Sequence, residues 1–350
     1  MNIRPVLAIC ASVLCLTAAA DMQREFNDAY KAYRDAVSAE QYHQAVAPAG
    51  EARRLGELLY AEDPRSIAKL VFNEGFVLGK LSRRDEAYPI LQQARKLTRE
   101  AFGEAAEEML DVEVALLGVA PLSRARYHMQ QALKLADVHR AGDDAFIAGI
   151  KLQGGLRLRG KDTMSLLEEA AESYQAAGRE EGFALAQFWI GKRHMQNKRH
   201  RRAPKPLEAA IDALPERHHL ALMARAHLVE VYERLGQSDE ATEHCLAIGR
   251  ATPWTGNDDY QPLFKRGPVY PQTALNNNRE GYVLLEFTVD EMGFVRNPEV
   301  VESGGNAIFR EPAVEAAKGF RYAPRFVDGK AVPVPNVRNR IVFKIRVTAN

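Results

Sequence analysis

Neither sign of charge is in excess in this sequence. Lysine and arginine number 47, and aspartate and glutamate 46, among the 350 residues, so the formal net charge is +1. A protein that holds nucleic acid or an anionic membrane surface through its overall field carries a basic excess. The balance therefore speaks against a nucleic-acid partner, and the specificity of the protein must lie in local surfaces.

Cysteine is also scarce, with three in the whole chain. Cys10 and Cys15 lie in the first apolar stretch, and only Cys245 follows it. A single remaining cysteine cannot form a disulfide within the chain, so an oxidising compartment is permitted but not required. Cys245 lies on an apolar helical face, and we expect it to be buried in a core.

The N-terminal apolar run is too short for a membrane span. It extends over 15 residues, from Val6 to Ala20, whereas a spanning helix needs about 20. One basic residue, Arg4, precedes it, and the small residues 18–20 close it. This is the layout of a secretory signal peptide, so we predict that residues 1–20 are a signal peptide cleaved after Ala20. The alternative is a short membrane anchor that is retained.

Motifs for catalysis or metal binding are missing as well. Of the nine histidines, His227 and His244 are typical in having no cysteine or carboxylate at ligand spacing. No Ser-His-Asp or Cys-His arrangement stands in a recognisable motif, and Gly154-Gly155 falls at a helix-packing position rather than in a phosphate-binding loop. We therefore expect no enzyme, no metal, no cofactor and no small-molecule substrate.

Residues 22–252 have a helical pattern with an internal period. Proline is sparse, and apolar residues return at spacings of three and four. Small residues recur twelve and nineteen positions after an anchor in each unit, and the steps between anchors are 42, 38, 41, 37 and 38 residues. The anchors are Tyr33, Gly75, Glu113, Gly154, Gly191 and Val229. The two positions hold Ala45, Ala87, Ala125, Leu166, Ala203 and Ala241, then Ala52, Ala94, Ala132, Ser173, Ala210 and Ile248.

This period predicts an α-helical solenoid of helical hairpins. Where the two helices of a hairpin touch most tightly, only a small side chain lets the backbones approach, which explains the recurring alanine. The units resemble tetratricopeptide repeats, and the last copy is the clearest, with Leu228, Tyr232, Leu235, Gly236, Ala241 and Pro253. The alternative is an irregular helical bundle with chance alanine spacing.

In repeats of this kind, the first helix lines a concave groove at positions three before, one after and four after the anchor. The first three repeats place six apolar side chains there: Tyr30, Phe72, Phe76, Leu110, Val114 and Leu117. We predict an apolar groove that holds a peptide or helix of a second protein. The alternative is that these side chains are buried between repeats. The densest basic cluster, at 192–202, we interpret as solvated charge.

The pattern changes after the repeats. Residues 253–262 contain two prolines, a glycine and an Asn-Asp-Asp run, and they read as a linker. The last domain is assigned to residues 263–350, and after Pro271 apolar and polar residues alternate, which is typical of strands. We predict strands at Tyr282–Asp290, Phe294–Ser303 and Arg338–Val347 and a helix at Ile308–Lys318. The order is strand, strand, helix, strand, a small α+β domain with its helix on the apolar face.

This last segment resembles the TonB C-terminal domain. The family's elements follow in order as Tyr270-Pro271, Gly281-x-Val283, Phe287-x-Val289-Asp290-x-x-Gly293, Phe309-Arg310-Glu311 and Phe320-Arg321-Tyr322-Ala323-Pro324. The last of these is a variant of the family's aromatic-Arg-aromatic-x-Pro signature. The match spans about a quarter of the chain.

The resemblance implies a protein that captures a short extended segment of an outer-membrane transporter, or of another envelope protein, as an added strand. The matching sheet edge is the strand at 338–347. The resemblance thus implies partner contacts at Tyr270, Pro271, Arg338, Arg340, Val342, Lys344 and Arg346. Basic side chains on an open edge also guard against aggregation, and Tyr270-Pro271 equally fits packing at the domain entrance.

Two features depart from TonB proteins. The N-terminal apolar segment is short and lacks a polar functional residue, and a helical solenoid replaces the Pro-rich spacer. One hypothesis is a TonB-family component of energised transport, whose repeats engage a second protein. The other is a periplasmic scaffold without a role in energised uptake. A retained inner-membrane anchor favours the first, whereas a cleaved leader and a periplasmic protein favour the second or an accessory version of the first. A homodimer through the open edge is a further alternative.

Overall fold

The computed structural model describes residues 4–160, 162–252 and 260–345, with side chains from residue 19 onward. The chain divides into two compact units, residues 1–177 and 178–350. Within the described residues, no helix combines the length and the apolar character that crossing a membrane requires. Most of the predicted linker at 253–262 lies outside the described residues.

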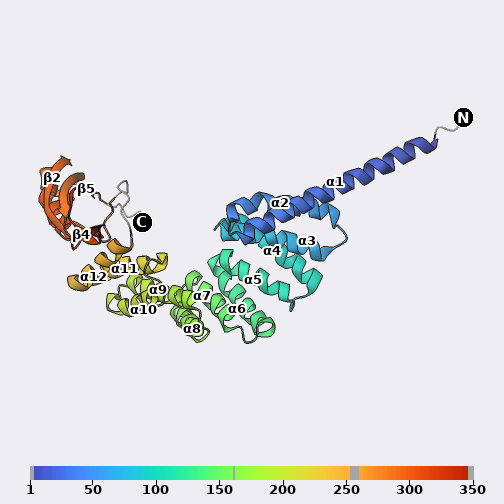
Figure 1. Ribbon diagram of the computed structural model, residues 1–350, viewed down its shortest axis with the longest axis horizontal. Coiled ribbons are helices and arrows are strands. Elements are labelled where there is room, and N and C mark those ends of the chain that lie inside the picture. Colours follow the sequence, from blue (N-terminus) through green and yellow to red (C-terminus); the bar gives the residue numbers. More distant parts are fainter. Residues whose placement is uncertain (1–3, 161, 253–259, 346–350) are drawn as a thin grey trace. The chain divides into compact units, whose positions relative to one another are not determined.

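The first unit is a series of helical hairpins in which each helix packs on the next (Figure 1). Its described helices are α1 (Arg4–Ser38), α2 (Tyr42–Leu59), α3 (Pro64–Lys80), α4 (Arg84–Phe102), α5 (Glu107–Val119), α6 (Leu122–His139), α7 (Asp144–Arg157) and α8 (Asp162–Ala176). Local sequence signals set the start of α3. Asp63 accepts hydrogen bonds from the backbone N–H groups of Arg65 and Ser66, and Pro64 occupies the first turn of α3.

The recurring small residues lie where the helices cross. All nine alanines of the repeat pattern are buried: Ala45, Ala52, Ala87, Ala94, Ala125, Ala132, Ala203, Ala210 and Ala241. A Cβ atom on Gly75 would lie 2.7 Å from Leu91 of the following helix, so no larger residue fits there. The predicted α-helical solenoid followed by a small α+β domain is confirmed. The assignment of the hairpins to tetratricopeptide repeats stays a prediction.

The second unit begins with further hairpins. Its helices are α9 (Glu180–Gln196), the 3-10 turn η1 (His200–Arg202), α10 (Pro204–Asp212), α11 (His219–Leu235) and α12 (Ser238–Ala251). Gly236 ends α11 in the left-handed conformation, with φ of 76°, which glycine adopts without a steric penalty. Cys245 on α12 is fully buried in the core of these helices, as expected from the sequence.

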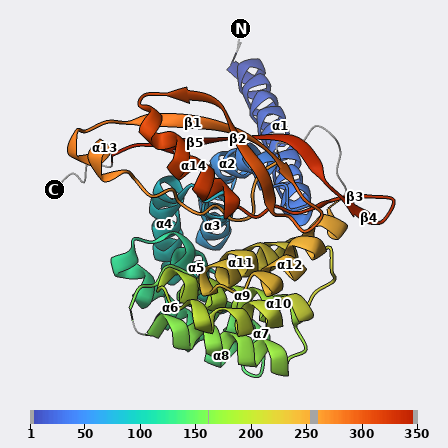
Figure 2. The same ribbon diagram turned by 90° about the vertical axis from the view of Figure 1, so that its left-hand side faces the viewer.

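A small sheet follows, seen with its helix in Figure 2. Its elements are α13 (Gln272–Asn276), β1 (Gly281–Val289), β2 (Val295–Gly304), η2 (Ala307–Phe309), α14 (Arg310–Lys318), β3 (Arg325–Val327), β4 (Lys330–Val332) and β5 (Val334–Phe343). The main sheet is antiparallel in the order β2-β1-β5, and β3 pairs with β4 in a separate hairpin that the sequence did not predict. The apolar alternate residues of β1 face a core that includes α14.

A buried ion pair joins this sheet domain to the last helical hairpin. Arg321 is 1% exposed, and its guanidinium donates to the Glu233 carboxylate of α11. It also donates to the Thr242 hydroxyl of α12 at 2.6 Å and to the Met292 carbonyl at 3.2 Å. The ring of Phe294 lies 3.7 Å from the guanidinium carbon. One side chain thus links two helices to the turn between β1 and β2.

We expect Arg321→Met to destabilise the sheet domain by about 3–5 kcal/mol, because Glu233 would remain as a buried charge without its partner. Hydrogen exchange of the β1 amides measures this loss locally. The double variant Arg321→Met/Glu233→Leu should recover most of it, since no uncompensated charge is left. As a control, Arg338→Met breaks an exposed pair with Glu286 and should cost at most about 1 kcal/mol. Equal losses for the two single variants would contradict this account.

Candidate functional site

Strand β5 presents an open backbone edge. It pairs with β1 on one side, and among the described residues no backbone hydrogen bond connects it to any other segment. Successive residues of an antiparallel strand direct their N–H and C=O groups alternately to the two sides. About half of the backbone groups of β5 therefore point away from the sheet. An added strand binds through such unpaired donors and acceptors.

The opposite edge, β2, is poorly shaped for the same task. Pro298 lies within it and has no N–H to donate, and Asn297 has a left-handed φ of 50°. The pairing of β2 with β1 also shifts register twice, between Leu284 and Leu285 and between Glu286 and Thr288. Prolines and bulges of this kind twist an edge and prevent further pairing. Strand β5 has a similar irregularity at its start, at Pro335 and Asn336 (φ of 59°), but its pairing with β1 is continuous over residues 337–343. The open edge is that regular stretch.

The basic side chains of β5 flank the open edge on the solvent face of the sheet. Arg338 donates from Nε to Oε2 of Glu286 on β1 at 2.7 Å. The guanidinium carbon of Arg340 lies 3.6 Å from the ring centroid of Tyr282 on β1. Both side chains therefore contact β1. Because they lie on the solvent face of the sheet, a strand added to β5 would meet them on that face only.

The rest of this row lies further along β5. Val342 is 48% exposed beside Tyr282. Lys344 is exposed directly after the strand, and Arg346 lies outside the described residues. Val342 thus provides an apolar surface at the open edge, with Arg340 two residues before it and Lys344 two residues after it. Opposite charges and apolar pairs on adjacent strands stabilise a sheet by about 0.2–1 kcal/mol each.

Tyr270 is partly buried, with its ring packed against the domain core. Its ring centroid lies 5.7 Å from those of Phe309 and Phe343, with an edge-to-face geometry in both cases. Its hydroxyl donates to the Arg279 carbonyl at 2.6 Å. Pro271 directly precedes α13, and its carbonyl accepts from the N–H groups of that helix. These two residues hold the domain entrance beside the end of β5, which fits the packing interpretation.

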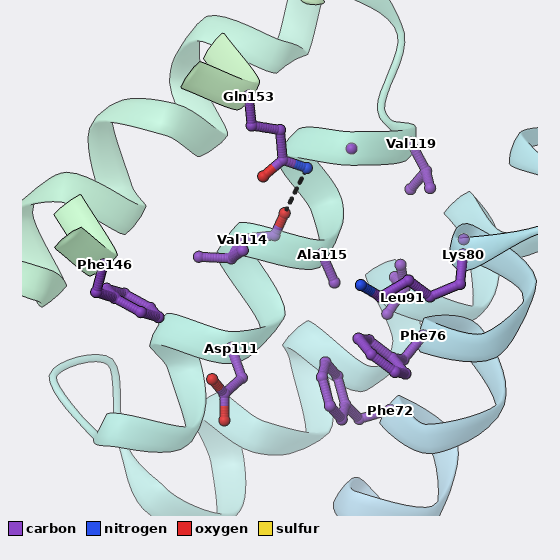
Figure 3. A pocket seen from close by; sticks show the side chains of 12 residues that line it. Phe72, Phe76, Lys80, Leu91, Asp111, Val114, Ala115, Val119, Phe146 and Gln153 are labelled. Carbon is purple, nitrogen blue, oxygen red and sulfur yellow. Dashed lines mark hydrogen bonds between the residues drawn. The ribbon is translucent and has the colours of Figure 1, made fainter. Parts of the chain in front are cut away.

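The first unit contains an aromatic groove between α3, α5 and α7 (Figure 3). Its volume is about 500 Å³, and a second hollow of about 340 Å³ adjoins it through shared residues Phe72 and Asp111. We call both hollows together the aromatic groove. Four of the six predicted residues line it: Tyr30, Phe72, Phe76 and Val114.

The prediction is wrong for the other two residues, Leu110 and Leu117, which are buried in the hairpin core. The reason is the turn between α5 and α6. It has two residues, 120 and 121, whereas the turn between α3 and α4 has three. The repeat pattern is aligned on the alanines of α6 and counts back to α5 at a fixed spacing. Because the turn is one residue shorter, each groove position on α5 lies one residue later than the pattern predicts. The residues of α5 that line the first hollow are Asp111, Val114, Ala115, Gly118 and Val119, and those that line the second are Glu107, Glu108, Asp111 and Val112.

The groove also holds polar groups that the sequence pattern did not single out. Gln153 donates from its amide to the Val114 carbonyl at 3.4 Å. Asp111 lines both hollows, and burial raises the pKa of its carboxyl, with a further contribution from Glu107 and Glu108. The positive charge of Arg140 acts to lower the pKa of Asp111 and so offsets part of this rise. Asp111 lies three, four and seven residues before 114, 115 and 118, and residues at these spacings share one face of a helix. This spacing is the signal in the sequence that identifies Asp111 as a groove residue.

Reactive chemistry has little support in the described residues. There, no group of three or more His, Cys, Asp or Glu side chains is arranged to hold a metal ion. Burial raises the pKa of the Cys245 thiol to about 11, so the sulfur stays protonated at neutral pH and is a weak nucleophile. The open edge of β5 and the aromatic groove both offer surfaces for binding polypeptide.

We expect Asp111→Asn to raise the thermal midpoint at pH 7. A carboxyl whose folded-state pKa is raised contributes stability below its ordinary value of 3.8, and this contribution is lost as pH rises through the raised value. The variant has no such charge, so its advantage should shrink as pH falls and vanish below that ordinary value. Thermal melts between pH 7 and 3.5 test this. Asp137→Asn, an exposed carboxylate on α6, should show no advantage at any pH.

Comparisons with known proteins agree with the sheet domain. The family model of the Gram-negative bacterial TonB protein C-terminal matches residues 266–345. The chain is 35% identical to a solved TonB2 protein from Vibrio anguillarum, over 27% of this chain and 92% of that one, with a TM-score of 0.22. The crystal structure of BtubC (BKLC) from P. vanneervenii is 14% identical over 66% of this chain and 89% of that one, with a TM-score of 0.28. No curated protein matches the chain.

Proposed function

Since residues 266–345 are a TonB C-terminal domain, we propose that this TonB-family chain binds an extended segment of another cell-envelope protein as a fourth strand on β5. The partner class follows from the family: an outer-membrane transporter, or a related envelope protein, with a segment that is free to extend. The chain supplies a preformed, three-stranded template for it. The role is recognition of protein by protein and involves no catalysis.

The open edge of β5 is the observation that carries this proposal. Each backbone hydrogen bond to an added strand contributes about 0.5–1.5 kcal/mol net, so four or five of them support a complex of moderate affinity. The blunted β2 directs pairing to one side of the sheet. The buried core under β5, which includes Ile341 and Phe343, keeps the template rigid, so little ordering cost falls on the chain itself.

Side chains next to the edge add sequence preference. Val342 offers an apolar neighbour to an incoming residue on the solvent face, while Arg340 and Lys344 offer cations on either side of it. A β-addition complex takes its affinity from the main chain and its specificity from such alternate positions. Tyr270 and Pro271 contribute by fixing the end of the strand rather than by touching the partner.

The aromatic groove supports a second protein contact. It is concave and presents Phe72 and Phe76 at its wall (Figure 3). Its polar and charged residues are Lys80, Asp111 and Gln153 in the first hollow and Lys69, Asn73, Thr98, Glu107 and Glu108 in the second. A groove with apolar anchors and polar groups beside them suits an amphipathic helix or an extended peptide. We therefore propose that the helical hairpins hold one protein while the sheet domain holds another.

Energised transport and passive scaffolding would both use these two surfaces. The two hypotheses differ in what they require of the N-terminal segment. An anchored chain would be able to transmit force from the inner membrane, whereas an exported, cleaved chain would be a periplasmic adaptor. The short apolar run that ends in Ala18-Ala19-Ala20 favours export and cleavage. We propose the periplasmic form, with an inner-membrane anchor as the alternative.

The edge hypothesis is tested with a pair of matched valines. Val342 on β5 is 48% exposed and Val301 on β2 is 50% exposed. We expect Val342→Pro to weaken binding of a partner segment at least tenfold, because proline removes an N–H and crowds the edge. Val301→Pro should leave the affinity within about twofold, provided that hydrogen exchange shows β1 intact in both variants. Calorimetric titration with synthetic transporter segments gives the affinities.

If both variants bind equally well, strand addition on β5 is wrong. Size-exclusion chromatography of the unliganded protein tests a third use of the edge, the pairing of two copies of the chain. A dimer that Val342→Pro converts to monomer, without any effect on partner affinity, would mean that β5 pairs with a second copy of the chain.

Processing of the N-terminus is tested by mass spectrometry and fractionation of the protein expressed in a Gram-negative host. We expect a mature protein that starts at Asp21, in the soluble periplasmic fraction. Replacing Ala18 and Ala20 by leucine should block cleavage, because small residues are needed at these two positions of the cleavage site. Ala19→Leu is the matched control and should be processed normally. A full-length, membrane-bound product would support the anchored alternative.

A further inference from the structure

A basic pocket lies between α4 and α6 in the first unit. Its volume is about 370 Å³, and the residues that line it are Tyr88, Gln92, Arg95, Lys96, Arg99, Arg124, Tyr127 and His128. Four of them are Lys or Arg and none is a carboxylate, in a protein whose overall charge is nearly balanced. It shares no residue with the aromatic groove.

A buried carboxylate organises the floor of this pocket. Glu113 of α5 is 1% exposed, and its Oε1 accepts from Nε of Arg95 at 2.6 Å. Its Oε2 lies 2.6 Å from Nδ1 of His128. Arg95 also donates from Nη2 to the Tyr127 hydroxyl at 2.8 Å, and its guanidinium stacks over the Tyr127 ring. Arg95 is thereby held in one orientation, so a ligand that binds it incurs little ordering cost.

The cations at the rim remain free for a ligand. Within the described residues, the side chains of Lys96 and Arg124 form no hydrogen bond or ion pair, and both residues are exposed. Arg99 has one distant pair, 3.9 Å from Glu104, and both partners are exposed. Glu113 compensates the charge of Arg95, so the positive field of the hollow comes mainly from Lys96, Arg99 and Arg124, and an anionic ligand would relieve their mutual repulsion.

We propose that this pocket binds an acidic protein segment with carboxylates at alternate positions of an extended chain. Arg95 and Arg99 are four residues apart on α4, a rise of about 6 Å. Alternate residues of an extended segment are about 6.6 Å apart, so successive carboxylates meet successive guanidinium groups. Arg124 faces them from α6, and the tyrosine rings provide walls for the aliphatic parts of the segment.

This site is independent of strand addition on β5. Its recognition depends on charge, whereas the edge of β5 offers backbone groups and the aromatic groove offers apolar contact. Charge-assisted hydrogen bonds from arginine to carboxylate are about twice as strong as neutral ones, and long-range attraction speeds the encounter of an acidic segment with the pocket. An acidic partner segment would be recruited here before or while other contacts form.

The test uses the full chain and a fluorescein-labelled peptide, Glu-Gly-Glu-Gly-Glu, followed by fluorescence anisotropy. We expect binding that falls at least tenfold between 50 and 300 mM salt, and no binding of the Gln-Gly-Gln-Gly-Gln counterpart. The double variant Lys96→Gln/Arg124→Gln should weaken binding about tenfold or more. Lys134→Gln removes a charge from an exposed site of α6 outside the pocket and should change the affinity less than twofold.

Three outcomes would overturn the proposal: absent binding of the glutamate peptide, equal affinity for the neutral peptide, or equal effects of the double variant and Lys134→Gln. Inorganic pyrophosphate provides a further arm. If it binds to the wild-type protein and is lost in the double variant while the peptide does not bind, the pocket takes compact phosphates instead of an acidic segment. Circular dichroism of each variant establishes that the helices remain folded.

Discussion

The buried guanidinium of Arg321 is the constraint on which the second unit depends. A cation that is 1% exposed is tolerated only when its charge is matched and most of its donors are bonded. Both Nη atoms of Arg321 donate hydrogen bonds, whereas its buried Nε has no partner in the described residues. Glu233 matches the charge, Thr242 and the Met292 carbonyl accept donors, and the Phe294 ring covers one face. Since these groups come from α11, α12 and the turn after β1, satisfying one side chain requires all three to be in place.

Other contacts follow from that arrangement. A Cβ atom on Gly249 of α12 would lie 2.3 Å from the Pro324 carbonyl oxygen, so helix and domain backbone approach closely there. Phe264 belongs to the core of the last hairpins and bridges to Arg321 through its backbone. The last hairpin and the sheet domain thus form one folded body, with the open edge of β5 as part of it. The proposed strand partner would bind a rigid template rather than a domain on a free tether.

The sequence predicted β1 to within one residue because its alternation is regular. It predicted β2 equally well because the turn at Met292-Gly293 indicates where a partner strand begins. It placed the last strand at 338–347, whereas β5 begins at Val334. Pro335 and Asn336, the latter with φ of 59°, interrupt the pattern, and an edge strand tolerates a proline that a central strand would not. The hairpin of β3 and β4 was missed because three-residue strands have too little periodicity to detect.

The candidate sites, like the strands, were predicted from the sequence only in part. Alternation along the chain alone placed Arg338, Arg340 and Val342 on one face of a strand, because side chains of a strand alternate by geometry. The ion pair of Arg338 with Glu286, the packing of Tyr270 and the open side of β5 depend on which elements are neighbours, and no local pattern encodes this. In the groove, a turn one residue shorter rotated α5 and exchanged Leu110 for Asp111. The pocket with Arg95, Glu113 and Arg124 was not foreseen at all, because its members come from three helices. The sequence by itself therefore determined the periods, the faces and the domain class, and the tertiary structure decided which faces meet.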